Sequence, residues 1–66
     1  MIFNVEQEVR LTGAGMEFIT KVKAEGKVWH CCKVREPGHY DRPSRYELAA
    51  QASWLLSVVV KELYDV

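Results

Sequence analysis

The chain has 66 residues, of which 48% are hydrophobic and 27% charged, and its nine cations balance its nine anions. This length accommodates one domain, and a domain so small buries only about 60% of the surface that its unfolded form exposes. Four glycines and two prolines are too few for a disordered or low-complexity chain. The core must be thin, and domains of this size usually gain stability from disulfides, a metal or a partner subunit.

Two adjacent cysteines, Cys31 and Cys32, indicate the redox state of the cell compartment in which the protein is found. Neighbouring side chains on a strand point to opposite faces and cannot form an unstrained disulfide, so we expect reduced thiols. The first ten residues lack the basic and apolar regions of a signal peptide. The longest apolar run, near residues 54–60, is too short to cross a bilayer. We therefore expect a cytoplasmic protein with no membrane contact.

The first half of the chain predicts three strands. Apolar and polar residues alternate over 2–11, which indicates a half-buried strand, and glycines at 12–15 indicate a turn. Further strands are expected at 16–23 and 27–34, so that the first hairpin pairs Val9 with Phe18.

The second hairpin determines which side chains of the third strand face the core. Gly26 suits the positive φ of a three-residue loop over 24–26, which pairs Lys23 with Lys27. In this register Gln7, Thr20 and His30 form a polar row on the inner face, where we expect a satisfied hydrogen-bond network.

The second half predicts a loop over 35–43 and then a helix over 44–64. Ser44 and Glu47 have the spacing of a capping box at the start of this helix. The fold class is therefore α+β, a three-stranded antiparallel β-meander followed by one C-terminal helix on one sheet face (β-β-β-α). The apolar stripe expected to cover the sheet consists of Leu48, Ala52, Leu55, Leu56, Val59 and Leu63.

The helix carries more apolar surface than the sheet needs, and an exposed tryptophan is typical of protein interfaces. We therefore expect a small non-enzymatic binding or regulatory protein, self-associating or bound to another protein, of the kind that phages carry as accessory or inhibitor proteins. A dimer through helix packing and one through strand edges both stay open, as does a folded-back 35–43 loop with Tyr40 covering Trp54. Trp54 and Val58 are expected one turn apart, roughly opposite the core stripe. The expected interface consists of Trp54, Val58, Ala50, Ser53, Ser57 and Lys61.

The alternative function is nucleic-acid binding on the outer face of the sheet. In the expected register Trp29 lies there among lysines, where it could stack on a base. The β-β-β-α order is similar to that of the three-stranded DNA-binding domains of some plant transcription factors and integrases, in topology alone. A net charge of zero argues against this alternative. The residues of this face would be Trp29, Lys21, Lys23, Lys27, Lys33 and Arg35.

Metal binding and catalysis find little support in the sequence. Residues 30–32 and His39 match no zinc-ligand spacing, and His39, Asp41 and Ser44 come without a glycine elbow or an oxyanion site. We expect no metal, no cofactor and no enzymatic activity.

A weak anion contact is the remaining candidate. Arg42 and Arg45 flank the expected helix start, where free backbone amides favour a phosphate or carboxylate. The capping box already occupies part of this position.

Overall fold

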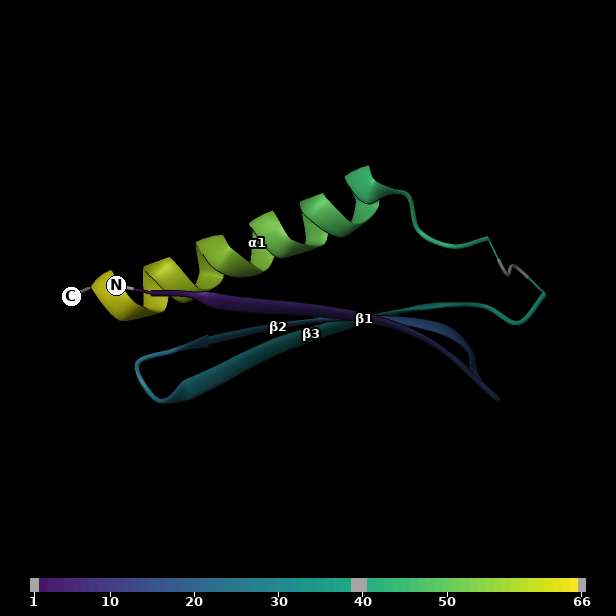
Figure 1. Cartoon of the computed structure of the whole chain (residues 1–66), viewed down its shortest axis with the longest axis horizontal. Helices are drawn as coiled ribbons and strands as arrows, with labels where there is room; N and C mark the ends of the chain where they lie inside the picture. The colour runs from purple at the N-terminus through teal and green to yellow at the C-terminus, as the bar shows by residue number, and fades with distance from the viewer. Residues whose placement is uncertain (1, 39–40, 66) are drawn as a thin grey trace.

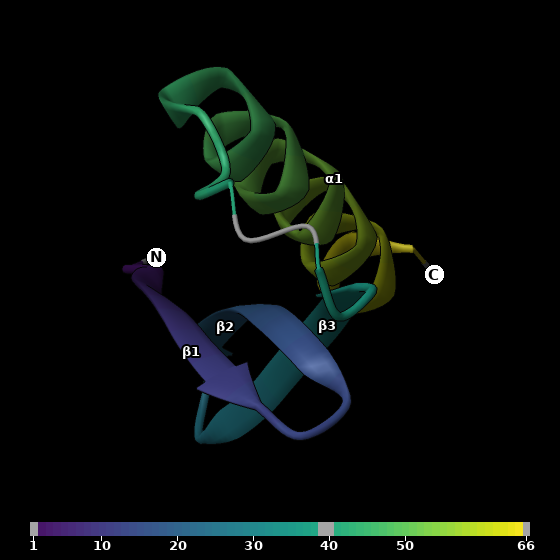
Figure 2. The same ribbon diagram turned by 90° about the vertical axis from the view of Figure 1, so that its right-hand side faces the viewer.

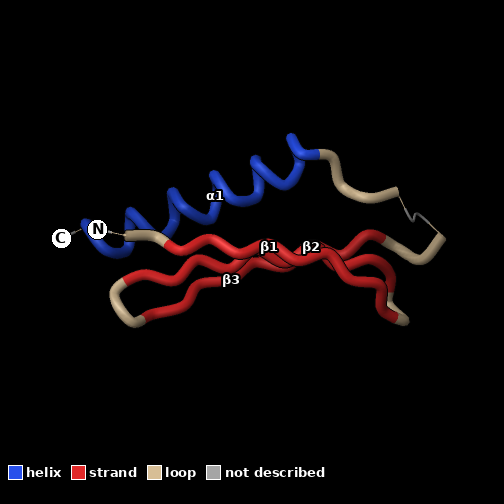
Figure 3. The backbone as a smooth tube through the Cα atoms, viewed as in Figure 1, coloured by secondary structure: helices blue, strands red, loops and turns tan. Residues whose placement is uncertain are grey.

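The computed structural model describes residues 2–38 and 41–65. It contains β1 (Asn4–Thr12), β2 (Gly15–Ala24), β3 (Lys27–Arg35) and α1 (Arg45–Tyr64). The strands form one antiparallel sheet in the order β1-β2-β3, and α1 lies across one face (Figures 1 and 3). The view along the sheet shows two layers, with α1 on the side of β2 and β3 (Figure 2). The predicted α+β meander with a C-terminal helix is confirmed, and each element begins and ends within two residues of its expected bounds.

The start of α1 has the Ser44 half of the predicted capping box, while the Glu47 side chain ties the helix to the sheet instead of forming the other half. The Ser44 hydroxyl accepts from the Glu47 amide at 3.2 Å, and the Leu48 amide donates to the Ser44 carbonyl at 3.1 Å. The Glu47 carboxylate accepts from Arg35 Nη2 at 2.8 Å. The first turn of α1 is therefore held both by its own cap and by the last residue of β3.

The first hairpin has the expected register, with Val9 opposite Phe18 around a two-residue turn at 13–14. Gly15, which follows the turn, has a φ of 127°. A Cβ atom there would lie 1.9 Å from the Arg35 carbonyl oxygen. Only glycine allows β3 to pass so close to the start of β2.

The second hairpin corrects the sequence prediction by one residue. Its turn contains only Glu25 and Gly26, with φ values of 53° and 73°, so Ala24 pairs with Lys27. Two positive φ values in a two-residue loop are those of a type I′ turn, which suits the twist of a hairpin. The expected pairing of Lys23 with Lys27 is wrong, and the shift reverses the face of every β3 side chain.

Trp29 and Cys31 consequently lie on the helix side of the sheet and pack against its core. The prediction that Trp29 lies on the outer face is wrong, because Trp29 pairs with Val22, a core residue. His30 pairs with Lys21 and is exposed, so its predicted place in the inner polar row is wrong as well.

The core lies under the C-terminal half of α1. Val22 of β2 packs with Leu55 and Val59, and all three are buried. The Trp29 indole Nε1 donates to the Glu62 carboxylate, which satisfies the ring where it meets the helix. The predicted apolar stripe is confirmed: Leu55 and Val59 are buried and its other four members are half-buried. Toward its N-terminus α1 rises away from the sheet (Figure 1).

A polar network holds the middle of α1 to the sheet. The fully buried Thr20 hydroxyl donates to Gln51 Oε1 at 2.7 Å and accepts from Gln7 Nε2 at 2.9 Å. Gln7 Nε2 also donates to the Leu48 carbonyl at 2.8 Å, and Gln51 Nε2 donates to the Phe18 carbonyl at 3.1 Å. The predicted polar row is therefore a satisfied network, with Gln51 of the helix in place of a histidine.

Candidate protein-binding groove

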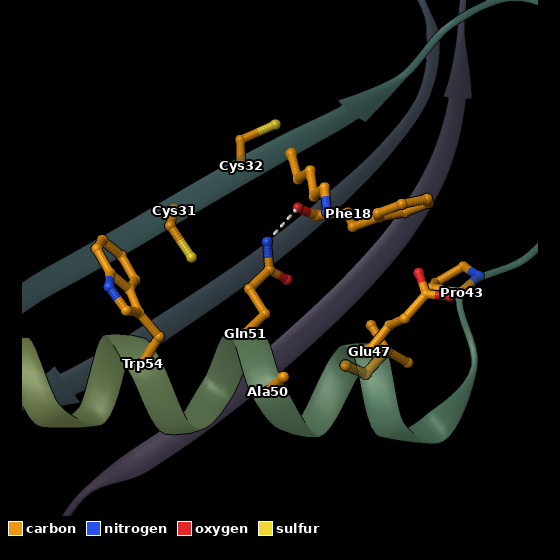
Figure 4. Close-up of a pocket in the computed structure, with 10 residues that line it drawn as sticks. Phe18, Cys31, Cys32, Pro43, Glu47, Ala50, Gln51 and Trp54 are labelled. Atoms are coloured by element: carbon orange, nitrogen blue, oxygen red, sulfur yellow. Dashed lines mark hydrogen bonds between the residues drawn. The ribbon is translucent and has the colours of Figure 1, made fainter.

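A groove of about 510 Å³ opens between β3 and the N-terminal half of α1 (Figure 4). It exists because the helix is packed on the sheet near its C-terminus and rises from it toward its N-terminus. Three parts of the fold contribute: the middle of the sheet, the segment before the helix, and one flank of α1. The lining residues are Phe18, Cys31, Cys32, Lys33, Pro43, Glu47, Leu48, Ala50, Gln51 and Trp54.

Trp54 forms the apolar rim of this groove. Its indole extends from α1 toward β3 rather than away from the sheet, and 60% of the residue is exposed (Figure 4). The Ser57 hydroxyl donates to the Trp54 carbonyl at 2.6 Å, so this serine is satisfied by its own helix. An aromatic ring standing over an open groove is available to pack against a second molecule.

The charges around the groove are unequal. Arg35 donates to the Glu47 carboxylate and to the Asp41 carbonyl, and its guanidinium carbon lies 5.0 Å from the centre of the Phe18 ring. Lys33 lies across from Phe18, is exposed, and forms no ion pair with another residue of the described part of the chain. The negative charge of Glu47 is therefore compensated, and the positive charge of Lys33 is not.

Cys31 lies on the helix side of β3, and Cys32 points away from the helix (Figure 4). Burial raises the pKa of the Cys31 thiol above its ordinary value of 9.0, and a backbone hydrogen bond with Thr20 acts in the opposite direction. At neutral pH the Cys31 thiol is protonated, and it behaves as a small apolar contact rather than a nucleophile.

The predicted interface residues extend along the helix beyond the residues that line the groove. Trp54 and Ala50 line the groove. Val58 is half-buried, whereas Ser53, Ser57 and Lys61 are exposed. Trp54 was expected opposite the core stripe, and that position is wrong: it stands on the flank next to β3 (Figure 4). Tyr40, considered as a cover for Trp54, and His39 lie outside the described residues.

The predicted nucleic-acid face is divided between the two sides of the sheet. Lys21 and Lys23 lie on the outer side, whereas Trp29 lies on the helix side together with the positions of Lys27, Lys33 and Arg35. Arg42 and Arg45 are exposed near the start of α1, and their predicted anion contact stays a prediction.

Sequence reasoning missed Phe18, Pro43 and Gln51 as parts of a site. The available signal was Gln51, which falls within the apolar stripe, three residues after Leu48 and four before Leu55. A polar side chain at such a position needs a buried partner on the facing element. The partners, the Thr20 hydroxyl and the Phe18 carbonyl, bring the sheet and helix together at the groove.

Over residues 2–38 and 41–65, no three side chains of His, Cys, Asp or Glu gather as a metal site would require. In the same residues α1 lacks the apolar length needed to span a membrane. Comparison with protein-family models, curated proteins and solved structures found no match to this chain.

Proposed function

We propose that this protein is a small non-enzymatic binding protein that contacts another polypeptide through the groove between β3 and α1. The observation that carries the proposal is Trp54, a large aromatic residue standing exposed over a groove with an apolar floor. Buried aromatic anchors supply much of the energy of protein interfaces. The half-buried Leu48 and the exposed Ala50 provide apolar surface against which such a contact would pack.

The amount of exposed surface supports the same proposal. The chain exposes 4895 Å², whereas a compact monomer of 7.6 kDa exposes about 4300 Å². The excess of about 600 Å² approaches the roughly 800 Å² that each partner buries in a standard interface. The molecule measures 44 × 21 × 18 Å, because one helix lies on a long, narrow sheet. A partner in the groove would cover part of this excess.

Site-specific photocrosslinking in cells that make the protein tests the proposal. A photoreactive phenylalanine analogue at position 54 should give a discrete crosslinked product, because that position stands over the groove. The same analogue at Tyr46, an aromatic position of α1 that is 80% exposed and outside the groove lining, is the matched control. The mass of the product separates a homodimer from a foreign partner.

The proposal is wrong if position 54 gives no product beyond those seen at position 46. A product of twice the chain mass would make the groove a self-association surface. In that case light scattering should find a dimer that Trp54→Glu separates and Tyr46→Glu leaves intact.

Nucleic-acid binding remains the alternative. Its remaining support is the pair Lys21 and Lys23 on the outer face, where Lys23 already pairs with Glu6 at 3.4 Å. Titration with a single-stranded oligonucleotide tests it. Affinity that falls steeply with salt and is insensitive to Trp54→Glu would favour this alternative.

A further inference from the structure

We propose that β3 binds an extended acidic segment of a partner protein as a fourth strand, and that alternate apolar side chains of this segment fill the groove. The inference rests on the proposed function and specifies its partner. The occupant is defined by three properties that the structure provides: a free strand edge, an apolar groove beside it and an uncompensated positive charge.

The free edge is the nine-residue strand β3, which among the described residues pairs with β2 on one side only. Its pairing with β2 is continuous from Lys27 to Arg35, with no proline and no bulge to interrupt the strand. Natural proteins often block a long regular edge, because its unpaired backbone groups accept another strand. Addition of a peptide strand to such an edge is an established mode of recognition.

The groove lies where an added strand would place its side chains. A fourth strand would run about 4.8 Å beyond β3, beneath the flank of α1 from which Trp54 extends. Its alternate side chains would point to the same sheet face as Cys31 and Lys33, which line the groove. Apolar side chains there would contact the indole of Trp54 and the methyl group of Ala50.

The charge of β3 selects an acidic occupant. Lys27, Lys33 and Arg35 are its charged residues, and Arg35 is the one whose charge is compensated, by Glu47. Opposite charges across neighbouring strands stabilise a sheet, and like charges opposite one another destabilise it. Lys27 and Lys33 lie on the helix side of β3, at the two ends of a row whose middle is Trp29 and Cys31. Carboxylates at the two ends of the apolar row, on the same face of the added strand, would therefore meet the two lysines.

The same charges disfavour a second copy of β3 as the occupant. In a symmetric antiparallel pairing centred on Cys31, Lys27 of one copy would face Arg35 of the other, twice. The β1 edge of a second copy carries Glu6 and Glu8, whose negative charge suits the lysines of β3 better. That pairing is head-to-tail, and it leads to open assemblies rather than to a closed dimer.

Three synthetic peptides serve as probes. The first has the sequence Ser-Glu-Thr-Val-Thr-Val-Thr-Glu-Ser, which places two valines between two glutamates on one face, with the six-residue spacing of Lys27 and Lys33. The second has lysine in place of both glutamates, and the third has proline in place of the central threonine. Each is titrated into the isotopically labelled full chain, and backbone amide signals and hydrogen exchange are followed by NMR. The acidic peptide should bind, and the proline and lysine peptides should bind at least about tenfold more weakly.

Hydrogen exchange distinguishes strand addition from simple occupancy of the groove. Amides of β3 that exchange rapidly in the free protein should be protected by the acidic peptide, and amides of β1 should be unchanged. Lys33→Glu should weaken binding of the acidic peptide by about tenfold or more, and Lys61→Glu, on α1 outside the groove lining, should have a much smaller effect.

Several outcomes would overturn the inference. Binding of the acidic peptide without protection of β3 would retain the groove as the contact surface and reject strand addition. Binding of the lysine peptide in preference would reject the charge argument. No binding of any peptide, together with a specific crosslink at position 54, would reject this occupant and leave the proposed function standing. Concentration-dependent assembly that depends on Glu6 and Glu8 would assign the edge to a second copy.

Discussion

The two halves of α1 are held to the same sheet by different kinds of contact. The C-terminal half packs Leu55 and Val59 on Val22 in an apolar core. The N-terminal half rises from the sheet and is held by hydrogen bonds of Gln51 and by the ion pair of Glu47. We call these the packed half and the raised half.

The comparison shows how a thin domain can keep a groove open. Apolar packing is non-directional and draws two surfaces together until no space remains. Hydrogen bonds instead fix a distance set by the length of the side chains that make them. The long side chains of Gln51 in the raised half and of Gln7 on β1 therefore hold helix and sheet together while leaving room beside Phe18 and Trp54. Variants that change one half at a time test this division.

The largest effect is expected in the packed half, for Leu55→Ala. Truncation of a buried leucine costs about 2–4 kcal/mol through lost burial and the cavity that remains. A chain of 66 residues is stable by only about 3–10 kcal/mol. Urea denaturation should therefore show a large loss of stability or an unfolded variant. The control Val60→Ala, at an exposed position of the same helix, should change stability by no more than about 0.5 kcal/mol. Equal losses in both would contradict the packed core.

A smaller effect is expected for Thr20→Val, which keeps the shape of the side chain and removes its hydroxyl. Gln51 and Gln7 would each lose a hydrogen-bond partner, at a cost of about 1–3 kcal/mol. Amide exchange should accelerate first in the raised half. Thr20→Ser retains the hydroxyl and should cost less than the valine variant. The opposite order in urea melts would mean that the network contributes little.

A gain is expected for Glu25→Asn in the turn between β2 and β3, next to the packed half. Glu25 has a φ of 53°, and asparagine accepts this left-handed conformation more readily than glutamate. The variant should be more stable by about 0.5–1 kcal/mol. Glu25→Gln removes the charge without this preference and should bring no such gain. Equal stability of the two variants would argue against a two-residue turn.

The smallest change is a difference in thiol reactivity. Burial raises the pKa of Cys31, so iodoacetamide at pH 8 should modify Cys31 more slowly than the exposed Cys32. Single-thiol variants, Cys31→Ser and Cys32→Ser, allow each rate to be measured separately. Because the folded state holds the Cys31 proton more tightly, its contribution to stability is present below pH 9.0 and declines as the pH rises above it. Equal modification rates would mean that the Cys31 thiol is as accessible to the reagent as the Cys32 thiol.

Much of the fold follows from local signals. The β-β-β-α order, the Ser44 cap and the first hairpin were predicted from alternation, capping residues and glycine positions, and all three are confirmed. The groove was not predictable in this way, because it depends on the height of α1 over the sheet. That height results from contacts between residues far apart in the chain, such as Gln51 with Phe18.

The register of β3 marks the boundary between the two kinds of information. Two loops fit the sequence between β2 and β3. A three-residue loop needs a positive φ at Gly26 alone, whereas a two-residue loop needs a positive φ at Glu25 as well, which glutamate disfavours. The tertiary structure decides for the two-residue loop, because this register packs the large, half-buried indole of Trp29 against the core of the packed half.

This register of β3 also brings charged side chains under the raised half of α1. Lys33 and Arg35 turn to the helix side, but the space beneath the raised half leaves Lys33 exposed and lets Arg35 reach Glu47. The sequence by itself therefore determined which strands and helix form, since those depend on residues close together in the chain. Only the tertiary structure decided which face of β3 meets the helix, since burial is summed over the whole molecule.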